Sequence, residues 1–439
     1  MTRTPPVAII GAGPVGLAAA AHLHRRGEPF VVVEAGPRAG HAVRQWGHVR
    51  LFSPWREVTD RASVELLRRH GWAHPDPEEV PDGDALCALY LEPLAALPAL
   101  APHIRFGARV ISVGRKDFDK VKTAGREAQP FVVEVERADG GTDRIEARAV
   151  IDASGTWARP NPAGSGGVPA PGERAAADRI DYAIPDVRGA ARAAFAGRTV
   201  LVLGSGHSAM NAILDLQALK AEGPDTRILW AIRRADVDTA FGGGAADQLP
   251  LRGALGATAR NAVRDGMVEL VAPFRVRAFR DAAGGRLEVV GDAGGEARSL
   301  VVDRVVAATG FRPDFTFASE IRLGLDPWLE CAAALGPLID PNIHSCGTVR
   351  PHGAKELAHP EAGFFVVGMK SYGRAPTFLM LTGYEQVRSV VASLVGDEAA
   401  AARVELVLPE TGVCRATPRV RDTAGEPRAA GVPARSCCG

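Results

Sequence analysis

The sequence predicts an α/β fold with two Rossmann-like three-layer nucleotide-binding domains, of which the second is inserted into the first. Two observations predict this fold. Glycine-rich loops at residues 11–16 and 204–209 each follow a short apolar run and each open a helical pattern. An apolar strand pattern then returns at residues 364–367, beyond the second loop. Because a strand, a glycine loop and a helix in that order form a nucleotide-binding βαβ unit, we expect two such domains.

The first unit begins with the apolar residues 7–10, which indicate a buried parallel strand. Gly11 permits a tight turn, Gly13 lets the backbone approach a pyrophosphate, and Gly16 allows close packing of helix on strand. The helix extends to about residue 26, and its N-terminus faces the phosphates. The predicted cofactor contacts in this loop are Gly11, Ala12, Gly13, Pro14 and Gly16.

An acidic residue ends the next predicted strand of this unit, at residues 30–34. Glu34 stands where a carboxylate can bind ribose hydroxyls. A glycine-rich turn alone is weak evidence, but strand, helix and acid together favour a dinucleotide site over an unrelated turn.

The second unit has its strand at residues 199–203, its helix to about residue 220 and its next strand at residues 227–232. Ala209 stands where the first loop has Gly16, which is a permitted variant of the pattern. The predicted contacts in this loop are Gly204, Ser205, Gly206 and Ser208.

Arginines replace the acid at the end of the second unit's second strand. Arg233 and Arg234 occupy the position that corresponds to Glu34. A carboxylate there would repel a 2′-phosphate, whereas guanidinium groups bind one. We therefore expect NADPH rather than NADH at this loop; the alternative is a solvated strand end.

Small residues end two further apolar strands, around Thr156 and Gly310, where a cofactor or the other domain can approach closely. Thr156 and Gly310 are therefore predicted cofactor contacts. The Pro/Gly-rich residues 159–167 and 309–313 predict the two chain crossings between the domains.

Length and composition fit a soluble globular protein. The chain has 439 residues, of which 46% are hydrophobic and 23% charged, and its formal net charge is +1. We expect neither nucleic acid nor a membrane as partner, because charge is balanced and no apolar run reaches the length of a membrane span. Glycines interrupt the N-terminal apolar stretch, which argues against a secretory signal. Six cysteines without a Cys-x-x-Cys pair favour the cytoplasm.

The order of these loops and strand ends resembles the two-dinucleotide flavoproteins, the superfamily of flavin-containing monooxygenases and thioredoxin reductases. The resemblance spans about residues 5–395 and implies FAD at the first loop and NADPH at the second. It also implies that Trp46, in the segment 46–54, lies near the flavin. By the same resemblance the backbone of Val110, on a strand at residues 108–113, contacts adenine.

Residues 368–378 and 382–386 resemble more narrowly the flavin-binding monooxygenases encoded in bacterial arsenic-resistance operons. By that resemblance Gly368 contacts the cofactor. The side chains that it places near the flavin, as candidate catalytic residues, are Lys370, Arg374 and Tyr384.

Two departures from the family pattern concern the oxygenating step more than the cofactors. Gly368-Met369 stands where related flavoproteins usually carry Gly-Asp, whose Asp contacts the ribityl chain. The fingerprint F-x-G-x-x-x-H-x-x-x-W/F-P of class B monooxygenases is absent before the second glycine loop.

The resemblance and the crossings together predict four segments. These are residues 1–165 as the first part of the FAD domain, 166–312 as the NADPH domain, 313–408 as the second part of the FAD domain and 409–439 as a disordered tail.

Two groups of residues could hold a soft ligand or a metal. Cys437 and Cys438 resemble the C-terminal pair of mercuric reductase and could capture trivalent arsenic or relay electrons; the alternative is two inert thiols on a frayed end. Another cluster matches no zinc pattern, so we expect it to line the substrate pocket and predict no metal site. Its members are His344, Cys346, His352 and His359.

Three functions remain open. We favour a monooxygenase in which FAD, reduced by NADPH, reacts with dioxygen to a C4a-hydroperoxide that oxygenates a soft nucleophile, sulfur or trivalent arsenic, in a small molecule. Arsenic resistance is the process that it would serve. The second function is a reductase that passes electrons to Cys437 and Cys438 or to a thiophilic metalloid. The third is a non-catalytic sensor of flavin or nucleotide.

Overall fold

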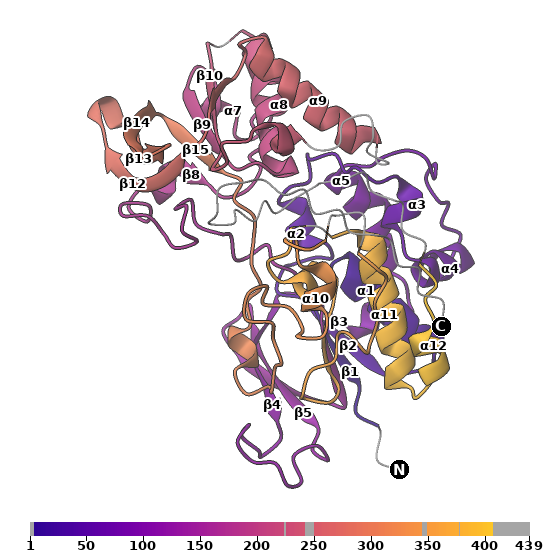
Figure 1. The fold of residues 1–439 in the computed structure, drawn as a ribbon. Coiled ribbons are helices and arrows are strands. Elements are labelled where there is room, and N and C mark those ends of the chain that lie inside the picture. The colour runs from indigo at the N-terminus through magenta and orange to yellow at the C-terminus, as the bar shows by residue number, and fades with distance from the viewer. Residues whose placement is uncertain (1–3, 224, 242–249, 345–348, 377, 407–439) are drawn as a thin grey trace, which may run out of the picture.

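The computed structural model describes residues 4–223, 225–241, 250–344, 349–376 and 378–406. The chain forms two α/β units, each built on a five-stranded parallel sheet. Figure 1 shows the unit that contains β1 in the lower half of the molecule and the unit that contains β9 in the upper half. None of the helices in these residues is long and apolar enough to cross a membrane.

The first sheet has the strand order β16-β7-β1-β2-β3. Its strands are β1 (Val7–Ile10), β2 (Phe30–Val33), β3 (Ile104–Arg105), β7 (Ala149–Asp152) and β16 (Phe364–Val366). The central strand β1 places Val7 opposite Phe30 of β2 and opposite Ala149 of β7. Strand β16 pairs with β7 although every strand of the second sheet lies between them in the chain. The second unit is therefore inserted into the first, which confirms the predicted fold class.

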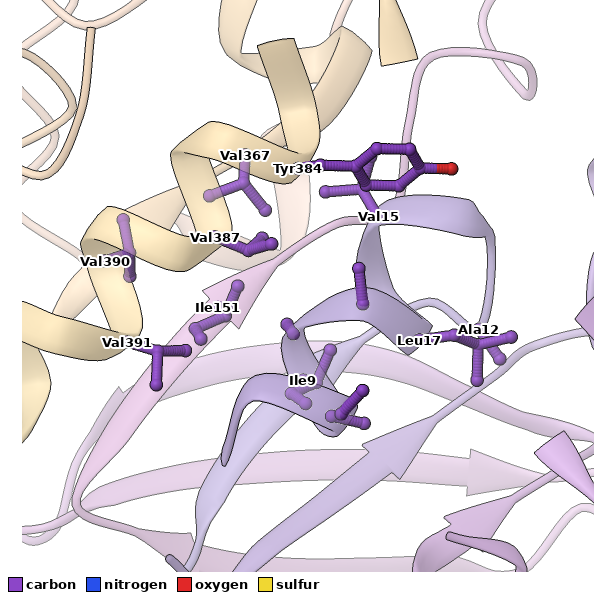
Figure 2. Close-up of a cluster of buried hydrophobic side chains, with 14 of the residues drawn as sticks. Ile9, Ala12, Val15, Leu17, Ile151, Val367, Tyr384, Val387, Val390 and Val391 are labelled. Carbon is purple, nitrogen blue, oxygen red and sulfur yellow. The ribbon is translucent and has the colours of Figure 1, made fainter. Parts of the chain in front are cut away.

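Two long helices cover one face of this sheet. Helix α1 (Pro14–Arg25) begins with proline at its first position, where a missing N–H costs nothing, and α11 (Met380–Leu394) packs beside it. Figure 2 shows Val387, Val390 and Val391 of α11 with Ile151 of β7 in this core. Burying each such side chain stabilises the fold by about 1.5–3 kcal/mol. The other helices of this unit are α2 (His41–Arg44), α3 (Trp55–Val58), α4 (Arg61–Arg69), α5 (Gly83–Leu86), α6 (Glu92–Ala95), α10 (Gly336–Ile339) and α12 (Glu398–Ala402).

The second sheet has the order β11-β10-β9-β15-β8. Its strands are β8 (Ile180–Asp181), β9 (Thr199–Leu203), β10 (Arg227–Ala231), β11 (Glu269–Val271) and β15 (Arg304–Ala307). Its helices are α7 (Arg192–Phe195), α8 (His207–Ala221) and α9 (Pro250–Arg264). The central strand β9 continues directly into the second glycine loop, as the sequence predicts.

Each unit also carries a three-stranded antiparallel sheet that the sequence analysis did not predict. One consists of β4 (Ala108–Arg115), β5 (Phe131–Arg137) and β6 (Thr142–Ala147). The other consists of β12 (Arg275–Asp281), β13 (Leu287–Ala293) and β14 (Glu296–Val302). Buried and more exposed residues alternate along β5 and β13, as is typical of an antiparallel sheet with one covered face.

The two predicted chain crossings lie against each other. Pro160 and Phe311 form an antiparallel bridge, and the backbone N–H of Asn161 donates to the carbonyl oxygen of Gly310 at 2.9 Å. The two connections between the units therefore form one hydrogen-bonded pair. The predicted boundaries at residues 165 and 312 stay a prediction. The predicted tail, residues 409–439, lies outside the described residues, which end at residue 406.

A buried ion triad ties the small sheet of the first unit to β16. Glu361 precedes β16, and its carboxylate accepts from Arg115 Nε at 2.8 Å and from Arg126 Nη2 at 2.8 Å. All three side chains are at most 4% exposed. The Arg115 guanidinium also lies 3.7 Å from the centroid of the Phe131 ring, which is a favourable cation–π contact.

The triad predicts how stability depends on pH. Burial raises the pKa of Glu361, but the hydrogen bonds from Arg126 and Arg115 together lower it by more. The net pKa of Glu361 therefore lies below its ordinary value. The paired carboxylate therefore stabilises the fold above the unfolded-state pKa of about 4.3, and this stability is lost as pH falls through the lower folded-state value. We expect Glu361→Gln to lower the free energy of unfolding at neutral pH by about 3–5 kcal/mol and to flatten its decline below about pH 4. Urea unfolding across this range measures both effects.

The control is Glu134→Gln, which removes an exposed ion pair with Arg144. It is expected to cost less than about 1 kcal/mol. If the free energy of unfolding of Glu361→Gln fell as steeply at acid pH as that of the wild type, the result would contradict the role of the triad.

Candidate functional site

The first glycine loop joins β1 to α1 in the conformations that its glycines permit. Gly11 has a φ of +101°, and a Cβ there would lie 2.8 Å from the carbonyl oxygen of Ala153. A Cβ on Gly16 would overlap the carbonyl oxygen of Gly11. A Cβ on Gly13 would meet nothing within 4 Å. Open space at Gly13, in front of the N-terminus of α1, fits a dinucleotide pyrophosphate.

Glu34 follows β2 and binds the loop directly. Its carboxylate accepts from the backbone N–H of Ala12 at 2.7 Å and from that of Gly36 at 2.7 Å. A carboxylate has about four acceptor positions, so capacity remains for ribose hydroxyls. The carbonyl oxygen of Glu34 also accepts from the N–H of Ala108 at 2.9 Å, which brings the start of β4, and with it Val110, to the same end of the sheet. These predicted contacts therefore lie together.

The second glycine loop repeats this geometry between β9 and α8. Gly204 has a φ of +126°, and a Cβ there would overlap the carbonyl oxygen of Ala308. A Cβ on Gly206 would meet nothing within 4 Å, as at Gly13. The indole Nε1 of Trp230 donates to the carbonyl oxygen of Gly204 at 2.7 Å and so fixes the loop from β10.

The small residues at the two strand ends have a more local role than expected. Ala153 and Ala308 lie against Gly11 and Gly204, the first glycines of the loops in their own units. The small side chains of these two alanines allow the strand end and the glycine loop of the same unit to lie close together. Thr156, which follows the first of these turns, is buried.

Two arginines stand at the end of β10, where the first unit has Glu34. Arg233 and Arg234 are both exposed. Arg233 donates from Nη1 to the carbonyl oxygen of Ser165 at 3.2 Å. An exposed cationic strand end beside a glycine loop fits a 2′-phosphate.

The turn that begins at Gly368 lies beside the first loop. A Cβ on Gly368 would lie 3.2 Å from the side chain of Val15, on the first turn of α1. The N–H of Gly368 donates to Gln386 Oε1 at 2.8 Å, and Gln386 Nε2 donates to Ser371 Oγ at 2.8 Å. Helix α11 therefore fixes this turn even though the family's Asp is absent from it.

The segment that begins at Trp46 reaches the second unit. Trp46 is partly buried against the core of the first unit. The Phe52 ring contacts the ring of His207, the first residue of α8, with centroids 5.1 Å apart. Trp157 stacks on Phe311 at the crossings, with centroids 4.9 Å apart. Aromatic side chains of the first unit therefore contact the start of α8 and the second crossing.

Two of the candidate catalytic side chains are buried and bound to other groups of the protein. Lys370 Nζ lies 2.6 Å from Asp152 Oδ2 and 3.0 Å from Ser154 Oγ, and the lysine and aspartate side chains are at most 1% exposed. The hydroxyl of Tyr384 donates to the carbonyl oxygen of Val58 at 2.7 Å, and burial raises the pKa of Tyr384 well above its ordinary value. These contacts suit residues that hold the structure around a cofactor.

Arg374 is exposed. Its guanidinium lies 3.9 Å from the carboxylate of Glu330, which makes a loose ion pair. Of the three candidates near the expected flavin, it alone has a side chain that a ligand can reach.

The two cysteines within the described residues are unsuited to redox exchange. Cys87 and Cys331 are buried. Burial raises the pKa of Cys87 to about 11 and that of Cys331 to about 12, so both stay thiols at neutral pH. The other four cysteines lie outside the described residues; they include Cys346 of the histidine cluster and the pair Cys437 and Cys438.

The remaining members of that cluster form no metal site. His352 and His359 are buried, which lowers the pKa of both, and His352 Nε2 pairs with Gln386 Nε2 at 2.9 Å. His344 is half-buried. Among the residues that the structure describes, no group of three or more His, Cys, Asp or Glu side chains is placed to hold a metal.

Comparison with known proteins decides the family. The model of the family described as "Pyridine nucleotide-disulphide oxidoreductase" matches residues 8–332. The chain belongs to this family. It is therefore a flavin-dependent oxidoreductase, which removes support for a non-catalytic sensor.

One curated relative is the indole-3-pyruvate monooxygenase YUCCA1 of Oryza sativa subsp. japonica, which is 35% identical over 221 residues. The matched part is 49% of this chain and 46% of the relative, so the chain spans about half the length of the curated relative that it matches.

Solved structures share the fold at low sequence identity. The bacillithiol disulfide reductase Bdr of Bacillus cereus has a TM-score of 0.65 at 18% identity and covers 89% of this chain and 100% of its own. The cadaverine monooxygenase DfoA of Erwinia amylovora, described as bound to FAD, has a TM-score of 0.64 at 14% identity and covers 94% and 99%. At these identities the similarity shows that the chain shares their fold.

Sequence reasoning missed two residues that shape the site. Trp230 lies in a predicted apolar strand and Gln386 in a segment that resembles a known family, but the sequence predicted no role for either side chain. The signal for each is a polar group within an apolar element, since a buried indole N–H or amide needs a partner.

Proposed function

We propose that this protein is a monooxygenase that uses FAD and NADPH to transfer one oxygen atom to a soft nucleophile, sulfur or trivalent arsenic, in a small molecule. NADPH, a proton, dioxygen and the nucleophile would yield NADP⁺, water and the oxygenated product. Bound FAD supplies the hydride acceptor and the centre at which dioxygen is activated. Arsenic resistance is the process that such an activity would serve.

The observation that carries the proposal is the environment of the two described thiols. Thiol–disulfide exchange needs a reactive thiolate, whereas Cys87 and Cys331, the cysteines among the described residues, are buried and their pKa values are raised. The similarity to a plant monooxygenase supports the same choice.

The chain's own residues would bind, orient and shield the reactants. The loop at Gly13 and the carboxylate of Glu34 would hold FAD, and the loop at Gly206 with Arg233 would hold NADPH. The aromatic contact between Phe52 and His207 would limit access of water between the two sites.

Oxygen uptake measured against NADPH consumption tests the proposal. With methyl phenyl sulfide or arsenite present, we expect about one dioxygen per NADPH and an equal amount of sulfoxide or arsenate, because one oxygen atom goes to product and one to water. NADPH oxidation that yields only hydrogen peroxide with every sulfide, thiol and arsenical tried would contradict it.

A reductase that passes electrons to Cys437 and Cys438 is the second candidate, favoured by the description of the family as disulphide oxidoreductases. Under this function, Ser at both positions would abolish anaerobic NADPH oxidation by a disulfide or a metalloid. Unchanged turnover would remove the cysteine pair from the mechanism.

A further inference from the structure

A buried carboxylate organises the segment that precedes the second sheet. Glu173 is 2% exposed. Its two oxygens accept three backbone N–H groups, from Ala163 at 2.8 Å, Gly164 at 3.0 Å and Ala170 at 2.7 Å. The hydroxyl of Tyr182 donates a fourth hydrogen bond, at 2.7 Å. An ionised carboxylate that accepts four bonds is a strong local organiser.

These bonds close residues 163–170 into one fixed loop. Three of the donors belong to its two ends, so the carboxylate stands where the ends meet. A Cβ on Gly164 would overlap the carbonyl oxygen of Val168, which shows how tightly the loop is closed. In the middle of the loop, the N–H of Ser165 donates to the carbonyl oxygen of Val276 on β12 at 3.3 Å.

The fixed loop holds the arginine proposed for the 2′-phosphate. The carbonyl oxygen of Ser165 accepts from Arg233 Nη1 at 3.2 Å. A guanidinium has five N–H donors, so one such bond positions the group and leaves the others for a phosphate. An arginine that is ordered before the ligand arrives loses less conformational entropy on binding.

We infer that Glu173 is a positioning residue that sets the preference for a 2′-phosphorylated nucleotide, by fixing the loop whose Ser165 carbonyl orients Arg233. The inference rests on the proposed assignment of NADPH to the second loop.

Binding of two nucleotide fragments to the purified, flavin-containing protein tests the inference without turnover. Calorimetry compares adenosine 2′,5′-bisphosphate with adenosine 5′-monophosphate, which differ only in the 2′-phosphate. For Glu173→Gln we expect the preference for the bisphosphate to fall about 3- to 10-fold with little change for the monophosphate. Tyr182→Phe, which keeps the three N–H bonds, is expected to reduce it about twofold.

Two matched variants separate the possible outcomes. Arg233→Gln is expected to reduce the preference about tenfold or more, because it removes the charged donor itself. Glu361→Gln removes a carboxylate that is buried to the same 2% in the other unit and is expected to leave the preference unchanged.

If the wild-type protein shows no preference for the bisphosphate, the NADPH assignment fails and the inference fails with it. If the wild type has the preference but Arg233→Gln leaves it intact, the 2′-phosphate is bound by another group and the inference alone is overturned. If Arg233→Gln reduces the preference but Glu173→Gln and Tyr182→Phe do not, only the role of Glu173 is overturned. The ratio of KM for NADPH and NADH in anaerobic flavin reduction should shift in parallel, since a general loss of stability would not favour one nucleotide.

Discussion

Purified Gly13→Ala protein is expected to fold like the wild type and yet to lose most of its FAD. Gly13 has a φ of −81° and a ψ of −174°, which alanine adopts without strain. The added methyl group would meet no protein atom within 4 Å and would fill only the space proposed for the pyrophosphate. We expect the Kd for FAD to rise about tenfold or more, which corresponds to about 1.4 kcal/mol or more. Flavin absorbance after purification and titration of the apoprotein measure this loss.

Two other glycines provide the controls. Gly206→Ala has the same open geometry in the second loop and is expected to keep full FAD content while weakening NADPH binding. Gly11→Ala places alanine at a φ of +101° and within 2.8 Å of a carbonyl oxygen, so it should lower the free energy of unfolding by about 3 kcal/mol. Wild-type flavin content in Gly13→Ala would show that the pyrophosphate lies elsewhere.

Lys370→Met is expected to lower the free energy of unfolding by about 3–5 kcal/mol, because it leaves Asp152 buried without its cation. The lysine also lies over the rings of Phe315 and Phe317, 4.9 Å and 4.6 Å from their centroids, so methionine keeps much of the packing. The lost free energy of unfolding would therefore reflect removal of the lysine charge rather than a change in side-chain volume. Denaturant unfolding of the flavin-free protein isolates this effect from cofactor binding.

The matched control is an exposed ion pair with the same distance between nitrogen and oxygen. Lys116 Nζ lies 2.6 Å from Glu146 Oε1, but both side chains are more than 40% exposed. Lys116→Met should cost less than about 1 kcal/mol. The double variant Lys370→Met with Asp152→Asn should regain much of the lost stability, since no buried charge is then unpaired. A cost for Lys370→Met as small as for Lys116→Met would contradict this account.

The sequence predicted the elements whose local pattern and tertiary role agree. The strand before Gly11, the helix after it and Glu34 follow from side-chain size, glycine spacing and charge, and the structure places them within a residue or two of expectation. The insertion of one unit into the other was predictable because apolar strand patterns lie on both sides of the second unit.

Contacts between segments that are distant in the sequence could not be predicted from local patterns of size, glycine spacing and charge. Lys370 and Asp152 are 218 positions apart in number and meet only because β16 returns to β7. A single lysine in a sequence is most often a surface residue, so its burial could not be inferred. Glu173 was missed for a similar reason, since its partners are backbone N–H groups that carry no sequence signal.

The paired crossings at Asn161 and Gly310 bear on how the two units can move. A single connecting strand would act as a swivel, about which the upper unit could rotate freely. Two antiparallel strands that are hydrogen-bonded to each other resist such twisting and leave bending as the softer motion. The two units are therefore expected to move relative to each other by bending at this pair rather than by twisting about it.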